Sequence, residues 1–332
     1  MDANPAASYK FNLLYKNNDQ LGKKQQQRRN ELLSNRLCKR DKLISSIRRL
    51  VSDVASDDEQ QNEDGRGNGV TSMNITNITN SATSQMPTPA GTGSIMSPYG
   101  HTSSHSPGAS PCSSSSSNKS SSIQIEDRKF RNKAMLSEWL VDRPMDFESE
   151  WVLKATPVGR RCLVFARKGH TVAYSRTGQF IRKFQSALPG GCHMHISHCR
   201  RQFAIVDCIY VQQTNTFYIM DALAWNEQKL YESDASFRFF WLQSRYNENQ
   251  EKFLTISSKN ECKFYCLNTY SASDRDILMA LENDPLIKEH NLQLDGLLFF
   301  HIRGPYVPGA NPLVLWIKPD MVNRVLSVDS MN

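Results

Sequence analysis

Aromatic side chains are nearly absent from the first 125 residues of this 332-residue chain. The chain has 15 Phe, 11 Tyr and 5 Trp, yet the only ones before residue 126 are Tyr9, Phe11, Tyr15 and Tyr99. A packed core needs such side chains, so their scarcity excludes an ordinary globular domain from that region. The sequence therefore predicts one folded domain, over residues 126–332.

Long apolar runs and catalytic motifs are also missing. No stretch approaches the roughly 20 apolar residues that span a bilayer, and the N-terminus lacks the apolar segment of a secretory signal. The eight Cys are scattered through the chain, which favours reduced thiols. The motifs G-x-S-x-G, H-E-x-x-H and the Walker phosphate loop do not occur. We therefore expect a soluble intracellular protein without a membrane partner.

A His- and Cys-rich run at residues 192–199 contains five potential metal ligands. The only second cluster, Cys262 and Cys266, lies about 60 residues further on, which is an awkward spacing for structural zinc. We therefore expect a polar loop at this run, and neither a metal nor a cofactor.

Positive charge is concentrated at the N-terminus. Residues 1–53 contain 12 Lys and Arg against 5 Asp and Glu, which equals the net charge of +7 of the whole chain. Residues 54–125 begin with acidic residues and end in a Ser-rich run, with 12 Ser in residues 101–122. They cannot bury enough apolar surface to offset the entropy of the chain. The sequence therefore predicts a basic arm over 1–53 and a disordered linker over 54–125.

The basic arm contains a predicted helix at residues 23–51, which lack Pro and Gly. Its apolar residues form one stripe: Leu33, Leu37, Ile44, Ile47 and Val51. Such a charged helix is marginal alone, so we expect it to order on a partner. Three interpretations of this helix remain open: a helix that is merely solvated, a basic arm that binds RNA phosphates, or a helix that is bound by an acidic transport receptor. The candidate receptor-binding residues are Arg28, Arg29, Arg36, Lys39, Arg40, Arg48 and Arg49.

From residue 126 onward, short apolar strands broken by turns predict an α+β domain with antiparallel sheets. The predicted strands lie near 151–156, 161–167, 171–176, 179–184, 203–210, 215–222, 262–267, 295–301 and 312–317. The predicted helices lie at 133–140, 236–246 and 273–283.

Four strand-linked fragments resemble the ordered motifs of the covalent nucleotidyltransferases, namely DNA ligases and mRNA guanylyltransferases. They are TPVGRR (156–161), DCIY (207–210), DGLLF (295–299) and LWIKP (315–319). Those enzymes use a lysine where Thr156 stands here, and a hydroxyl without an adjacent base cannot replace that nucleophile. Lys154 is displaced from the position by a full pleat repeat. The resemblance implies a nucleotide-sized pocket in a protein that is not an enzyme.

Eight fragments in order resemble the snurportin family, over about residues 133–327. They are LSEWLVDRP (136–144), EWVLKATPVGRR (150–161), AYSRTG (173–178), LPGG (188–191), IVDCIY (205–210), FRFFW (237–241), DGLLFFH (295–301) and PLVLWIKP (312–319). The resemblance implies an adaptor that binds the 2,2,7-trimethylguanosine cap of spliceosomal small nuclear RNAs and carries their ribonucleoproteins into the nucleus. It also implies importin-beta as receptor of the basic arm, an export receptor, and shuttling between nucleus and cytoplasm.

The resemblance further implies five cap-binding residues. Trp316 matches the tryptophan on which the cap base stacks, and Trp139 the one beside the N2-methyl groups. Because N7-methylguanine is cationic, an indole face adds cation–π attraction to stacking. Ser137 and Thr156 match residues that hydrogen-bond the guanine, and Arg176 matches a basic residue that faces the phosphates. Relatives carry Cys at the position of Thr156 and Lys at that of Arg176, and the second change keeps the charge.

Departures in the basic arm leave the identity of the importin open, since Cys38 and Asp41 interrupt its basic run. We expect the arm and the cap-binding domain to act independently, so that deleting residues 1–53 leaves cap affinity nearly unchanged. Two alternatives remain: a general RNA-binding protein that uses the basic arm, and an active guanylyltransferase or RNA ligase.

Overall fold

The computed structural model describes residues 18–34, 36–56, 130, 132–193, 202–226 and 228–328. The predicted linker therefore lies outside the described residues, except for 54–56, which end a helix. Most of the His- and Cys-rich run also lies outside them, because residues 194–201 are not described.

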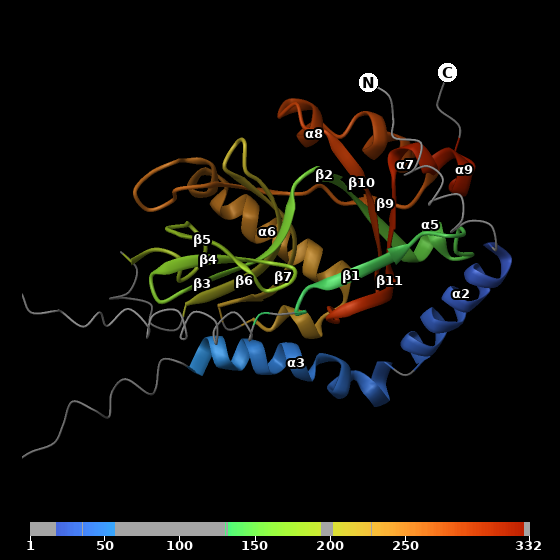
Figure 1. Cartoon of the computed structure of the whole chain (residues 1–332), viewed down its shortest axis with the longest axis horizontal. Helices are drawn as coiled ribbons and strands as arrows, with labels where there is room; N and C mark the ends of the chain where they lie inside the picture. The colour runs from blue at the N-terminus through green and yellow to red at the C-terminus, as the bar shows by residue number, and fades with distance from the viewer. Residues whose placement is uncertain are drawn as a thin grey trace, which may run out of the picture.

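Two sheets form the centre of the domain (Figure 1). The five-stranded sheet has the order β1-β11-β10-β2-β9, and the six-stranded sheet has the order β5-β4-β3-β6-β7-β8. The strands are β1 (Met135–Trp139), β2 (Trp151–Pro157), β3 (Arg160–Arg167), β4 (His170–Ser175), β5 (Phe180–Phe184), β6 (Phe203–Val211), β7 (Thr216–Trp225), β8 (Lys263–Cys266), β9 (Tyr270–Ser271), β10 (Leu294–His301) and β11 (Gly309–Ile317). All nine predicted strands are confirmed, to within a few residues at each end.

The helices are α2 (Asn18–Ser34), α3 (Arg36–Ser56), α5 (Phe147–Glu150), α6 (Ala235–Leu254), α7 (Asp274–Glu282), α8 (Pro285–Glu289) and α9 (Val322–Leu326), with short 3-10 helices at Leu230–Glu232 and Pro319–Met321. The predicted helices at 236–246 and 273–283 are confirmed as α6 and α7. Helix α6 buries one stripe on the six-stranded sheet, and α5, α7 and α9 pack on the five-stranded sheet. None of the described helices combines the length and the apolar character that a membrane crossing requires.

The predicted α+β architecture with mainly antiparallel sheets is confirmed, and it differs from the prediction at one helix and two strand pairs. The segment 133–140 contains strand β1 instead of a helix, because β1 pairs with β11 and this tertiary contact outweighs local helix propensity. The sheets are also not purely antiparallel, since β1–β11 and β7–β8 are parallel pairs. Strands β7 and β8 are connected through α6. Strands β1 and β11 are the first and the last strand of the domain along the sequence. Neither pair is therefore a hairpin.

The basic arm forms two helices in place of one, and both lie against the domain (Figure 1). Three residues of the predicted stripe, Ile44, Ile47 and Val51, are buried in one cluster with residues of the domain such as Phe165 and Tyr174. Burial of this apolar face accounts for the order of α3. The partner on which the helix orders here is thus the chain's own domain.

Candidate functional site

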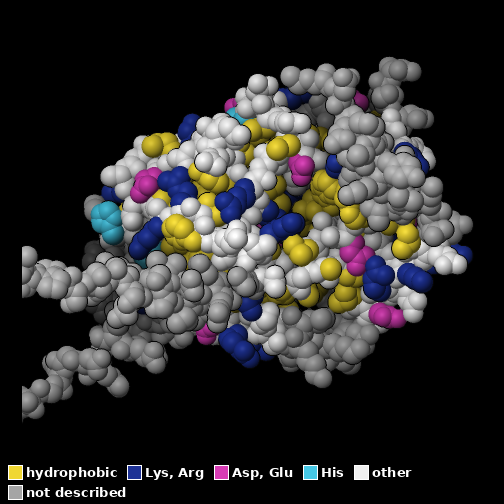
Figure 2. Space-filling model, in the orientation of Figure 1, with side chains coloured by type: hydrophobic (Ala, Val, Ile, Leu, Met, Phe, Trp, Pro, Cys, Tyr) yellow, Lys and Arg dark blue, Asp and Glu magenta, His cyan; other side chains and the backbone are white. Residues whose placement is uncertain are grey.

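A cavity of about 660 Å³ opens between the two sheets. Its lining comes from β1, β2 and β11 of one sheet and from β3 and the β4–β5 turn of the other. It includes all five residues that the family resemblance implies for cap binding: Ser137, Trp139, Thr156, Arg176 and Trp316. Figure 2 shows Lys and Arg side chains interspersed with hydrophobic ones across one face of the molecule. The pairing of β1 with β11 brings residues 137–139 next to residue 316, although these positions lie far apart in the sequence.

The two tryptophans form a corner in this cavity. Trp139 and Trp316 are paired across β1 and β11, and their ring centroids lie 4.6 Å apart with an angle of 66° between the planes. A base inserted between two parallel rings needs about 7 Å, or two contact distances. A planar ligand therefore cannot lie between the two indoles, and it can stack on only one of them.

Gly296 provides the space for the Trp316 indole. A Cβ atom at this position would lie 2.6 Å from Nε1 of Trp316 and 2.5 Å from the carbonyl oxygen of Ile317. Both distances are below any ordinary contact, so the missing side chain lets the indole lie close to β10.

The hydroxyl proton of Thr156 is engaged in a hydrogen bond within the protein. Its Oγ1 donates a hydrogen bond of 2.7 Å to the carbonyl oxygen of Gly296, and the residue is only 4% exposed. Since a hydroxyl has one proton and two lone pairs, this side chain can still accept a hydrogen bond from a ligand in the cavity.

Arg161 lines the cavity, but its charge is already compensated. Its guanidinium donates two hydrogen bonds to the carboxylate of Asp207, at 3.1 and 2.8 Å, and one to the carbonyl oxygen of Met135 at 2.5 Å. Tyr306 donates to the same carboxylate at 2.7 Å and accepts from the amide of Met135 at 3.0 Å. Burial alone would lower the pKa of Arg161, but Asp207 outweighs burial and raises it. The network thus fixes the start of β1 to the six-stranded sheet.

Arg160 and Arg176 are the two exposed cations of the cavity lining. Motif matching identified Arg176 and missed Arg160. The sequence feature that could have pointed to Arg160 is the pair of arginines in TPVGRR. Only the second arginine of this pair matches the ligase-type motif. Asp295 also lines the cavity, where burial raises the pKa of its carboxyl and Lys318 opposes this effect.

Lys154 lies on the same strand as Thr156 but outside the cavity lining. It is 1% exposed, and its amine donates to the carbonyl oxygen of Leu267 at 3.1 Å and to Oγ1 of Thr269 at 2.8 Å. The amine also lies 4.4 Å from the ring centre of Phe239, and burial lowers its pKa. Its position is that of a structural lysine, bonded away from the nucleotide-sized cavity.

Of the candidate receptor-binding residues whose side chains are described, two form ion pairs with the domain and one is buried. Arg28 pairs with Glu138 at 2.5 Å, Arg48 pairs with Glu232 at 3.1 Å, and Arg29 is only 3% exposed. Arg49 is exposed. The side chains of Arg36, Lys39 and Arg40 lie outside the described residues.

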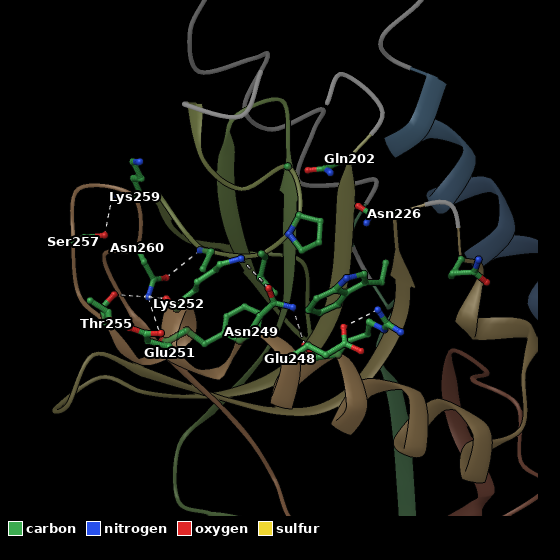
Figure 3. Close-up of a pocket in the computed structure, with 18 of the residues that line it drawn as sticks. Gln202, Asn226, Glu248, Asn249, Glu251, Lys252, Thr255, Ser257, Lys259 and Asn260 are labelled. Atoms are coloured by element: carbon green, nitrogen blue, oxygen red, sulfur yellow. Dashed lines mark hydrogen bonds and ion pairs between the residues drawn. The ribbon is translucent and has the colours of Figure 1, made fainter. Parts of the chain in front are cut away.

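A larger cavity, of about 1380 Å³, lies between α6 and the ends of β6 and β7 (Figure 3). It contains none of the predicted site residues. The side-chain amide of Asn260 donates to the carbonyl oxygens of Lys252, Phe253 and Thr255, all at 3.1 Å. These hydrogen bonds satisfy backbone carbonyl groups at the C-terminal end of α6. Among the described residues, no three His, Cys, Asp or Glu side chains are placed to hold a metal ion.

Residues 133–319 match a family model described as Snurportin1, m3G cap-binding domain. Among solved structures, the fold is similar to the ligase domain of M. tuberculosis LigD, with 13% identity, a TM-score of 0.37, and coverage of 56% of this chain and 58% of that chain. A mycobacterial DNA ligase D complexed with ATP and MES gives 14% identity, a TM-score of 0.38, and coverage of 56% and 59%. Similarity at this level supports no inference about activity.

The family match extends over more than half of the chain and contains all five residues that were expected at the cap site. It also contains the Arg161–Asp207 network that fixes β1 in place. This chain therefore belongs to the family of the snurportin1 m3G cap-binding domain.

Proposed function

We propose that this protein binds the 2,2,7-trimethylguanosine cap of spliceosomal small nuclear RNAs and links their ribonucleoproteins to an importin. The membership of its domain in the cap-binding family supports this proposal. The single observation that carries it is that the five expected residues line one cavity, although they come from separate strands and a turn.

The methylated base would stack on the indole of Trp316, where the π-system attracts its delocalised positive charge. Trp139, which stands at an angle of 66° to Trp316, would lie along the edge that carries the N2-methyl groups. Each buried methyl contributes about 0.8 kcal/mol, so two favour the trimethyl form by about 1–2 kcal/mol. The lone pairs of Thr156 and the hydroxyl of Ser137 supply the polar contacts to the guanine.

The phosphates of the cap would lie at Arg160 and Arg176, the exposed cations of the cavity lining. Nucleotidyl transfer is not part of the proposed function. The hydroxyl of Thr156 donates its proton to a backbone carbonyl, which does not act as a base, and the amine of Lys154 is bonded elsewhere. Incubation with labelled GTP or ATP should therefore leave no covalent adduct on a denaturing gel.

Helices α2 and α3 are the proposed receptor-binding element, and importin-beta or another importin is the proposed receptor. Three residues of the apolar stripe, Ile44, Ile47 and Val51, are buried on the domain, so a receptor that wraps α3 must displace them. An export receptor would return the empty adaptor, and the protein would shuttle between nucleus and cytoplasm.

A tryptophan-fluorescence titration of the full chain with trimethylguanosine and monomethylguanosine cap dinucleotides tests the proposal. We expect saturable quenching that favours the trimethyl form and an affinity about 5- to 150-fold weaker in Trp316→Ala, because stacking on a cationic base contributes about 1–3 kcal/mol. Trp241→Ala is the matched control, since Trp241 lies on α6 and lines the other cavity. Equal responses to both caps, or no response, would contradict the function.

A further inference from the structure

Strand β1, which carries Ser137 and Trp139, is an edge strand of the five-stranded sheet. It pairs only with β11 in that sheet, so its outer edge needs another cover. Helix α2 provides this cover. The side-chain amide of Gln25 donates hydrogen bonds of 2.9 Å to the carbonyl oxygen of Trp139 and to the carboxylate of Glu138.

The contact between α2 and β1 is built from oriented and largely buried groups. Gln25 is 3% exposed, and its amide oxygen accepts from Arg29 at 3.2 Å, which fixes the direction of its donor group. Arg29 is itself 3% exposed and lies 5.7 Å from the ring centre of Trp151. Arg28 adds an ion pair of 2.5 Å to the same carboxylate oxygen of Glu138.

These contacts reach two of the three residues of β1 that line the cavity of the proposed cap site. Glu138 and Trp139 both line the cavity. Glu138 and Trp139 are consecutive residues of β1, so the hold of α2 on the Glu138 carboxylate restrains the backbone that carries the tryptophan. The bond from Gln25 to the carbonyl oxygen of Trp139 fixes the backbone of the tryptophan directly.

We propose that Gln25 and Arg28 are positioning residues of the cap site, so that α2 completes the cavity from outside the cap-binding domain. This inference rests on the proposed function. It has a consequence for the adaptor as a whole. A receptor that lifts α2 away from β1 weakens cap binding, and a bound cap in turn strengthens the docking of α2 by the same factor. The two ends of the molecule are then coupled, in contrast to the independence that the sequence predicts.

Cap titrations of full-length variants test this coupling. We expect Gln25→Ala combined with Arg28→Ala to raise the Kd for the trimethylguanosine cap dinucleotide about five- to tenfold, the lower range of typical coupling. Arg28→Lys should restore most of the affinity lost in Arg28→Ala, because a lysine keeps the ion pair. Lys24→Ala is the matched control: it removes a positive charge from an exposed position of the same helix and should leave the Kd unchanged.

Hydrogen exchange of residues 18–34 supplies a readout that general destabilisation would not produce. The cap dinucleotide should slow exchange in α2 of the wild-type chain and leave it unchanged in the double variant. If the double variant does not fold, Arg28→Ala alone serves, since the Arg28 side chain is 49% exposed. An unchanged Kd in these variants, with binding still lost in Trp316→Ala, would overturn the coupling and leave the function intact. Absence of cap binding by the wild-type chain would overturn both.

Discussion

The indole of Trp316 lies where it does because residue 296 has no side chain. In Gly296→Ala, the new methyl group would collide with Nε1 of the indole and with the carbonyl oxygen of Ile317. We expect the indole to be displaced, cap affinity to fall about tenfold and stability to fall by about 1–3 kcal/mol, as in other overpacked sites. Fluorescence titration and thermal unfolding measure the two effects.

Gly304→Ala is the control for this substitution, because a methyl group there meets nothing closer than 3.0 Å. It should leave cap affinity unchanged. Wild-type affinity in Gly296→Ala would show that the base does not stack on Trp316 in the observed position of the indole.

The hydroxyl of Thr156 has two roles that substitutions can separate. Thr156→Ser keeps the donor to the Gly296 carbonyl and the lone pairs that face the cavity, so we expect nearly unchanged cap affinity. Thr156→Val removes both and leaves a buried carbonyl unsatisfied, which costs about 1–3 kcal/mol of stability. If Thr156→Val loses stability but binds the cap like the wild type, the guanine contact comes from the backbone.

At the scale of elements, hydrophobic periodicity was sufficient for most of the domain. The long strands β6 and β7 bury every residue, and their continuous apolar runs could be recognised locally. Strand β1 could not, because its five residues are extended only through pairing with β11, about 170 residues later. For the same reason, motif matching singled out Trp139 and Trp316 but not Gln25, whose contacts with β1 form only in the folded chain.

The docking of α3 can be tested through Ile47, which is fully buried in the cluster shared with the domain. Ile47→Ala should lower the free energy of unfolding by about 2–4 kcal/mol, because it leaves a cavity in that cluster. Ser52→Ala, at an exposed position of the same helix, is the control. Chemical denaturation of the full chain measures the difference. A free energy unchanged by Ile47→Ala would mean that α3 is not docked on the domain in solution.

At the scale of the whole molecule, the positive charge of the chain and its cap site are separate features. The arm over residues 1–53 accounts for the net charge of +7, whereas the cavity lining contributes two exposed arginines. Part of the arm's charge is moreover paired within the molecule, as in Arg28–Glu138 and Arg48–Glu232. An RNA held by the cap site and an RNA held by the arm should therefore respond differently to salt.

The salt dependence of binding distinguishes the adaptor from a general RNA-binding protein. For a short trimethyl-capped single-stranded RNA, each neutralised phosphate contributes about −0.7 to the slope of log K against log salt concentration. Contacts with Arg160 and Arg176 alone predict a slope of about −1.4, and each substitution by Gln should reduce its magnitude by about 0.7. Arg40→Gln, in the arm, should leave the slope unchanged. If the seven candidate residues of the arm held the RNA instead, they would neutralise the phosphates in place of the cavity arginines. The slope would then approach about −5, and Arg40→Gln would reduce its magnitude.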